Sequence, residues 1–258
     1  MKRIGVVALN TFREAVRDRV LYNLVFFALL MIAAAIVVGQ ISIGIEEIVI
    51  GSLGLSSISL IGLLIAVFIG VGLVSKEMDK RTLYALLAKP VRRWEFLVGK
   101  FAGLVLTLAV NTAAMAVGLF LALLYVKHSL EVTDAILLVA VYFILLKLAL
   151  VVALALLFSC STTSLLAILY TTGIYIAGLF VSQMRNLSSG TMSAAAAAIM
   201  RWLSYILPNF DNFDVMAAAT HGRSIPAALI FQNTIYAVVY CAIVLAAAAV
   251  VFSRRDLK

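Results

Sequence analysis

Long apolar runs alternate with short polar segments along the whole chain. A transmembrane helix needs roughly 20 mainly apolar residues, and six stretches meet that requirement. They are residues 20–39, 50–74, 101–126, 135–158, 163–182 and 227–252. The pattern therefore predicts an all-α, polytopic membrane protein with six transmembrane helices, in which residues 1–258 form a single membrane domain.

Composition agrees with this class. Hydrophobic residues make up 65% of the 258 residues and charged residues only 12%, whereas soluble domains are about 45–50% apolar and about 25% charged. No polar stretch is long enough to bury the core of a separate soluble domain. We expect no nucleic-acid partner despite the net charge of +8. The positions of the basic residues are explained by the membrane topology instead.

The distribution of lysine and arginine predicts the orientation. If the amino terminus is cytoplasmic, the inside segments are 1–19, 75–100, 159–164 and 253–258, and they hold fifteen of the twenty Lys and Arg residues. Four lie outside and Lys147 lies within a span. Cytoplasmic loops carry an excess of Lys and Arg. We therefore expect a multi-pass protein of the cytoplasmic (inner) membrane with both termini in the cytoplasm.

Residues 1–19 have the pattern of an amphipathic helix. A polar stripe recurs at helical spacing opposite a mainly apolar face; its members are Asn10, Arg13, Glu14, Arg17 and Asp18. Such a helix is expected to lie on the cytoplasmic membrane surface, with its cations near anionic lipid headgroups. A basic flank that only sets the topology is the alternative.

Ser75 to Lys100 is a charged island between two apolar runs, with seven Lys or Arg residues and three acidic ones. Its first part combines an apolar face (Leu83, Tyr84, Leu86, Leu87) with a charged rim. This combination is typical of a helix that docks into a groove on a partner protein. Pro90 then forces a turn towards the next span.

The chain has no visible energy source of its own. It lacks the GxxxxGK[ST] loop that cradles nucleotide phosphates, and the predicted spans contain no acidic residue for proton or sodium coupling. The histidines and cysteines form no metal-binding motif, so no cofactor or metal is expected on this chain. Energy must come from a partner, unless transport is passive.

The charged island resembles the signature of ABC-2-type permeases, which are membrane subunits of ABC exporters with the type V fold. The similar residues are Glu77-x-x-x-Arg81-Thr82-Leu83, Leu86-Leu87-x-Lys89-Pro90-Val91-x-Arg93 and Gly99-Lys100-x-x-Gly103. The resemblance covers the whole chain. The Arg81-Thr82 version is similar to the branch that includes the permease for maturation of the nitrous oxide reductase copper site.

The resemblance implies a working unit of two permease copies, identical or similar, and two separate ABC ATPase subunits that bind ATP and Mg. It implies that residues 77–87 form a coupling helix that docks on the ATPase through Glu77, Asp79, Arg81, Thr82, Leu83, Leu86 and Leu87. Pro90, Arg93 and Lys100 return the chain to the membrane, and residues 1–19 become a connecting helix. For Glu77, a helical pair with Arg81 is the alternative role.

Lys147 lies about 12 residues into its span, roughly 18 Å along a helix. A charge near the bilayer centre costs at least about 2.5–3.5 kcal/mol, so Lys147 is expected to face protein or a wet cavity. One hypothesis places it on the translocation path, where it meets an anionic group of the substrate. The other is structural, with the ammonium satisfied by hydroxyls and carbonyls, or by Asn111 or Thr112.

Residues 183–226 are the longest segment between spans and are expected on the outer side. Within them, residues 193–207 predict an interfacial helix with Trp202 and Tyr205 as anchors. The following NFDNFD stretch (residues 209–214) predicts a capped helix start; it lacks the glycine and terminal Glu of a calcium loop. The glycines of the second span predict close helix packing, within the chain or at a dimer contact.

Three functions fit these features. The first is the permease subunit of an ATP-driven exporter, without an ATPase site of its own. The second is the membrane component of an ATP-driven assembly or mechanotransmission complex that acts on an extracytoplasmic partner through residues 183–226. The third is an energy-independent channel or scramblase, which leaves the ordered charged island unexplained. The residues do not indicate a substrate.

Overall fold

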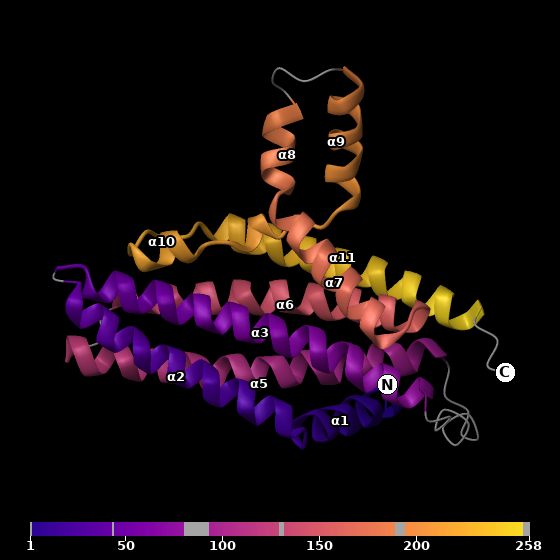
Figure 1. The fold of residues 1–258 in the computed structure, drawn as a ribbon, viewed down its shortest axis with the longest axis horizontal. Coiled ribbons are helices and arrows are strands. Elements are labelled where there is room, and N and C mark those ends of the chain that lie inside the picture. Colours follow the sequence, from indigo (N-terminus) through magenta and orange to yellow (C-terminus); the bar gives the residue numbers. More distant parts are fainter. Residues whose placement is uncertain (1, 43, 80–92, 129–131, 189–193, 255–258) are drawn as a thin grey trace.

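The computed structural model describes residues 2–42, 44–79, 93–128, 132–188 and 194–254. Every regular element in these ranges is a helix (Figure 1). In chain order the elements are α1 (Lys2–Val16), α2 (Arg19–Ile41), α3 (Glu46–Asp79), α5 (Arg93–Lys127), η1 (Val132–Ala135), α6 (Ile136–Ser161), α7 (Ser164–Leu179), α8 (Val181–Ser188), α9 (Ala194–Ile206), η2 (Asp211–Phe213), α10 (Met216–Thr220) and α11 (Ala227–Arg254).

Among the described residues, five helices are long and apolar enough to cross a membrane. The candidate spans are Leu24–Ile41, Glu46–Gly72, Trp94–Lys127, Ile136–Ser161 and Ala227–Ser253. The remaining predicted span, residues 163–182, contains α7, whose 16 residues rise only about 24 Å. The bilayer core is about 30 Å thick. The polytopic all-α class is therefore confirmed, while the count of six spans stays a prediction.

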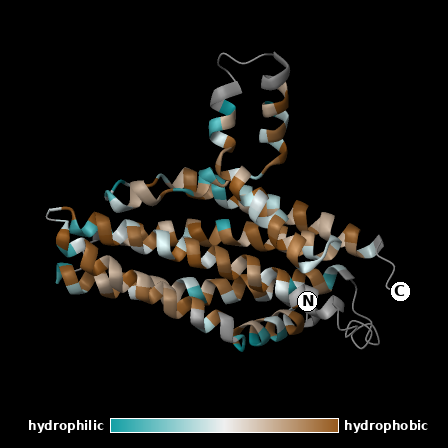
Figure 2. Cartoon of the chain, viewed as in Figure 1, coloured by the Kyte–Doolittle hydropathy of each residue, from teal (hydrophilic) through white to brown (hydrophobic). Residues whose placement is uncertain are grey.

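The long helices lie side by side, and α1 crosses one end of the bundle (Figure 1). At this end, which we call the basic end, α3 finishes at Asp79, α5 begins at Arg93 and α11 finishes at Arg254. We call the opposite end, with Glu46 and Lys127, the far end. Hydrophobic residues run along the long helices, and hydrophilic residues gather on α1 and near the helix ends (Figure 2).

Helix α3 is the centre of the bundle and packs against α2, α5 and α6. Its glycines lie at these contacts. A Cβ atom built on Gly54 would lie 2.4 Å from Leu119 Cδ1 of α5, and one on Gly62 would lie 2.6 Å from Leu148 Cδ1 of α6. The predicted close packing is thus confirmed, and at these two glycines it is packing within one chain.

We expect the substitution Gly62→Leu to destabilise the fold, because a leucine side chain there meets the fully buried Leu148. Overpacking of this kind costs about 1–3 kcal/mol, which would lower the unfolding temperature of the purified protein in detergent micelles. The matched control is Gly72→Leu on the same helix, where a Cβ atom has no neighbour within 4 Å. Equal melting temperatures for the two variants would contradict the assigned helix contact.

Candidate functional site

At the basic end, α1 lies directly against the first turns of α5. A Cβ atom on Gly99 would lie 2.7 Å from Val7 Cβ, and one on Gly103 would lie 2.5 Å from the carbonyl oxygen of Ala8. Real Cβ atoms do not approach other atoms this closely, so only glycine permits this distance between the two helices. The two glycines of the Gly99-Lys100-x-x-Gly103 motif are therefore the positions at which α5 packs against α1.

Lys100 lies between these two glycines and is covered by α1. Its side chain is only 2% exposed, and its Nζ atom is 3.6 Å from Glu14 Oε2. The ammonium also lies 5.7 Å from the centre of the Phe96 ring, which in turn stacks on Phe252 of α11 at 6.2 Å between centroids. Lys100 thus connects α1 with α5, and Phe96 extends the contact to α11.

The predicted docking residues adjoin this contact in sequence. Glu77 and Asp79 lie in the last turns of α3, which continues from Glu46 without a break, and Arg93 is the first residue of α5. The other predicted residues, Arg81, Thr82, Leu83, Leu86, Leu87 and Pro90, lie outside the described residues. The docking roles of these residues therefore stay predictions.

Lys147 is buried between α6 and α3. The residue is only 5% exposed, and its Nζ atom donates a hydrogen bond of 2.7 Å to Ser59 Oγ. The structure therefore supplies the hydroxyl partner that the structural hypothesis required, although from α3. Thr112 instead donates to the Leu108 carbonyl of its own helix. A role for Lys147 in the translocation path stays a prediction.

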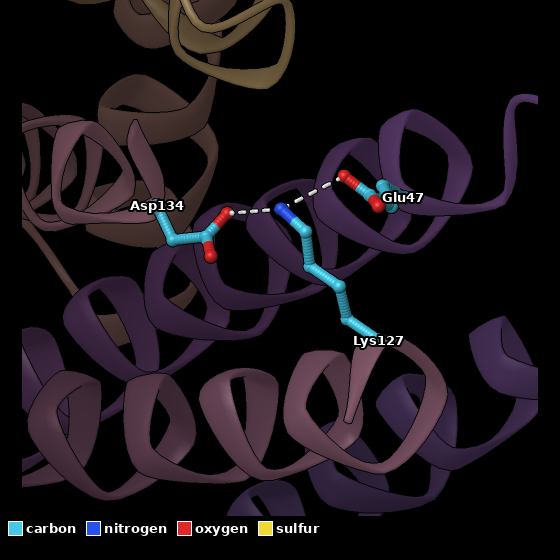
Figure 3. A network of polar contacts seen from close by, with 3 residues as sticks. All are labelled: Glu47, Lys127 and Asp134. Atoms are coloured by element: carbon cyan, nitrogen blue, oxygen red, sulfur yellow. Dashed lines mark hydrogen bonds and ion pairs between the residues drawn. The ribbon is translucent and has the colours of Figure 1, made fainter. Parts of the chain in front are cut away.

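A second charged cluster lies at the far end (Figure 3). Lys127 Nζ is 3.0 Å from Glu47 Oε2 and 3.3 Å from Asp134 Oδ1, so it joins α5 to α3 and η1. Beside it is a cavity of about 290 Å³ that is also lined by Thr220 and His221. Sequence analysis counted Lys127 only as one of the four basic residues outside and missed this network.

Metal ligation has no support in the part of the chain that the structure describes. No group of three or more His, Cys, Asp or Glu side chains is placed there to hold an ion. In the 209–214 stretch, Asp214 Oδ1 accepts a hydrogen bond from the Met216 N–H at the start of α10, and Asn209 Oδ1 accepts one from the Asp211 N–H. These oxygens accept from nearby backbone N–H groups, but the N-cap residues of η2 and α10, Phe210 and Val215, make no side-chain cap hydrogen bond, so the predicted side-chain cap is absent at these two helix starts.

The family model described as ABC-2 family transporter protein matches residues 6–257. The chain belongs to this family. The match extends from α1 to the end of α11 and includes the predicted docking segment. A comparison with curated proteins gives no match. Membership confirms the predicted class, a permease component of an ABC transporter in the membrane. The narrower resemblance, to the branch for nitrous oxide reductase maturation, stays a prediction.

For an ABC-2 permease, the contact between α1 and α5 is the best candidate for a functional site that the structure describes. It lies at the end of the bundle from which the predicted docking segment departs and to which it returns. Sequence analysis named Lys100 but not its partner. The signal available was Glu14, which with Asp18 is one of two acids in the otherwise basic amphipathic segment 1–19.

We expect Ser59→Ala to lower the stability of this ABC-2 permease, because the buried Lys147 ammonium loses its hydroxyl acceptor. Leaving a buried polar group without its partner costs about 1–3 kcal/mol. The matched control is Ser57→Ala, since the buried Ser57 hydroxyl only donates to the Leu53 carbonyl of its own helix. Thermal unfolding in detergent measures both variants.

A second substitution makes this test specific to the pair. In the Ser59→Ala background, Lys147→Met removes the ammonium that needs a partner, and replacing a buried charge by an apolar side chain is often neutral or stabilising. The double variant should therefore melt above Ser59→Ala alone. A double variant that melts lower would show that Ser59 does not serve Lys147.

We also expect Glu14 and Lys100 to be energetically coupled. Glu14→Gln leaves the buried ammonium beside a neutral amide, and an ion pair with a partly exposed partner contributes up to about 1 kcal/mol. In a double-mutant cycle with Lys100→Met, Glu14→Gln should destabilise the wild-type protein but have little effect in the Lys100→Met background. Additive losses in unfolding temperature would exclude the ion pair as the connection between α1 and α5.

Proposed function

We propose that this chain is the permease subunit of an ATP-driven exporter. Two copies of the permease work with two separate ATPase subunits, which bind ATP and Mg. The basic end faces the cytoplasm, because Lys and Arg are concentrated there. The observation that carries the proposal is the contact of α1 with α5, which makes the basic end a rigid platform.

The packing offers a route for force from the ATPase to the spans. The docking segment is attached to α3 at Asp79 and to α5 at Arg93. The glycine contacts pack α5 tightly against α1, and α3 tightly against α6. When ATP binding draws the ATPase subunits together, a push on the docking segment therefore moves these four helices as a group and opens a path outward.

The predicted docking residues provide the direct test. We expect the double substitution Glu77→Lys with Leu83→Asp to abolish co-purification of the ATPase subunit, because it reverses a charge on the rim and buries a carboxylate in the apolar face. The control is Arg223→Glu, which reverses an exposed charge near the far end. Both variants should fold, as judged by thermal unfolding in detergent.

The results separate the three functions. Loss of the ATPase together with loss of substrate-stimulated ATP hydrolysis supports the exporter. If the ATPase stays bound in the double variant, the assignment of residues 77–87 as the docking helix is wrong. If the intact complex hydrolyses ATP at a rate that no substrate changes but that an extracytoplasmic protein alters, the mechanical complex replaces the exporter. An energy-independent channel or scramblase would bind no ATPase at all.

A further inference from the structure

Asp214 lies at the depth of the hydrocarbon core. The preceding residue, Phe213, contacts Phe143 of α6 at 6.5 Å and Tyr236 of α11 at 6.1 Å between ring centroids. These partners follow the first residues of their helices by seven and nine positions, or about 10 and 14 Å along the helix axes. Helices of about 39 and 42 Å extend only about 5 Å beyond each side of a core about 30 Å thick. The contacts therefore place Phe213 and Asp214 inside the core.

The Asp214 side chain is exposed at this depth. Its Oδ1 atom accepts a hydrogen bond from the Met216 N–H, and no Lys or Arg in the described ranges forms an ion pair with its carboxylate. A charge in the bilayer core costs at least about 2.5–3.5 kcal/mol, so charged residues there face protein or a water-filled cavity. Water or a polar ligand, rather than acyl chains, is therefore expected to reach Asp214.

Tyr175 of α7 and Lys147 of α6 lie close enough to Asp214 to interact with it electrostatically. The Tyr175 ring packs against Phe210 of the same segment at 5.0 Å between centroids. Tyr175 is only 9% exposed, and its hydroxyl has no hydrogen-bond partner among the residues that the structure describes. Buried polar groups nearly always have a partner, so this hydroxyl points to one that the chain does not supply.

The neighbouring polar side chains, in contrast, are satisfied within the chain. The Asn209 amide donates to Asn212 Oδ1 at 3.0 Å, and the Asn233 amide of α11 donates to the Asn212 carbonyl at 2.9 Å. These hydrogen bonds hold the segment against the bundle. They leave the second carboxylate oxygen of Asp214 and the hydroxyl of Tyr175 available to a ligand.

We propose that Asp214 and Tyr175 form a binding subsite for a primary ammonium group on the molecule that this permease transports. The carboxylate supplies the opposite charge, the tyrosine hydroxyl oxygen accepts a second N–H, and the aromatic ring favours a nearby cation. An anionic group would be repelled by the exposed carboxylate, because the positive charge of Lys147 is buried and already bonded to Ser59. The inference rests on the proposed function, since it names the substrate class of the exporter.

Binding of a fluorescent amine to the full-length chain in detergent micelles tests this subsite. The probe is dansylcadaverine, which combines a primary ammonium with a dansyl group whose emission changes in apolar surroundings. Its N-acetylated form is the neutral control, and empty micelles give the background. We expect the wild-type protein to bind the amine about tenfold more tightly than the neutral form, as charge-assisted hydrogen bonds require.

Two substitutions assign the binding to these residues. Asp214→Asn should lose most of the preference for the amine, because the new side chain keeps an oxygen for the Met216 N–H but carries no charge. Tyr175→Phe, which removes only the hydroxyl, should weaken amine binding by about threefold. The matched control is Asp211→Asn, which removes a charge from the same stretch but is not among the electrostatic partners of Tyr175 and Lys147.

The subsite is overturned if the amine and its neutral form bind equally well, or if Asp214→Asn keeps the full preference. A preference that is lost equally in Asp211→Asn also overturns it, because the effect would then follow net charge alone. Should Asp214→Asn fail to fold, Tyr175→Phe decides the question, and an unchanged affinity for the amine in that variant rejects the subsite.

ATP hydrolysis by the complete complex keeps the subsite and the exporter apart. Stimulation by dansylcadaverine that disappears in Asp214→Asn supports both proposals. Binding that depends on Asp214 without any stimulation supports the subsite and counts against the exporter. Stimulation of equal size in the wild-type and Asp214→Asn complexes overturns the subsite and leaves the exporter standing.

Discussion

The absence of water from the bilayer core is the constraint on which this structure depends, because every polar group there needs a partner within protein. In the spans, the Lys147 ammonium donates to Ser59, and the Ile206 carbonyl accepts from Tyr240. At the basic end, the buried Lys100 ammonium is paired with Glu14. Each pair also selects two neighbouring elements: α6 with α3, α5 with α1, and α9 with α11. Apolar packing alone gives weak specificity between helices in lipid, so these few polar contacts define which helices are neighbours.

Small residues give the same neighbours their rigidity. Glycines at the contacts of α3 with α5 and α6 leave room for leucine side chains of the neighbouring helix, and Gly103 of α5 brings its helix close to the main chain of α1. A displacement of one helix at the basic end is therefore transmitted to the helices packed against it. In the proposed exporter, such stiffness would let ATP hydrolysis by a partner subunit act across the membrane.

The apolar pattern was sufficient to predict the all-α membrane class and the long spans, because the length of a span follows from the thickness of the bilayer. It did not predict that α7 ends at Leu179, since residues 180–182 continue the apolar run and the turn depends on the distant Phe210, whose N–H bonds the Gly178 carbonyl. The site was partly predictable. Lys147 was identified as unusual and Lys100 as part of the return to the membrane. Glu14 and Ser59 were not identified as their partners, because helix pairing is a non-local property that spacing along the chain does not encode.

The ion pair between Glu14 and Lys100 has a consequence for biogenesis. Chains are made from the amino terminus, so α1 is complete before the ribosome has synthesised α5. When Lys100 reaches the membrane, its counter-charge is already present on the helix that will cover it. An acid encoded near the carboxyl terminus would be synthesised only after most of the chain. The order of the two residues in the gene thus makes this ion pair available as soon as α5 is synthesised.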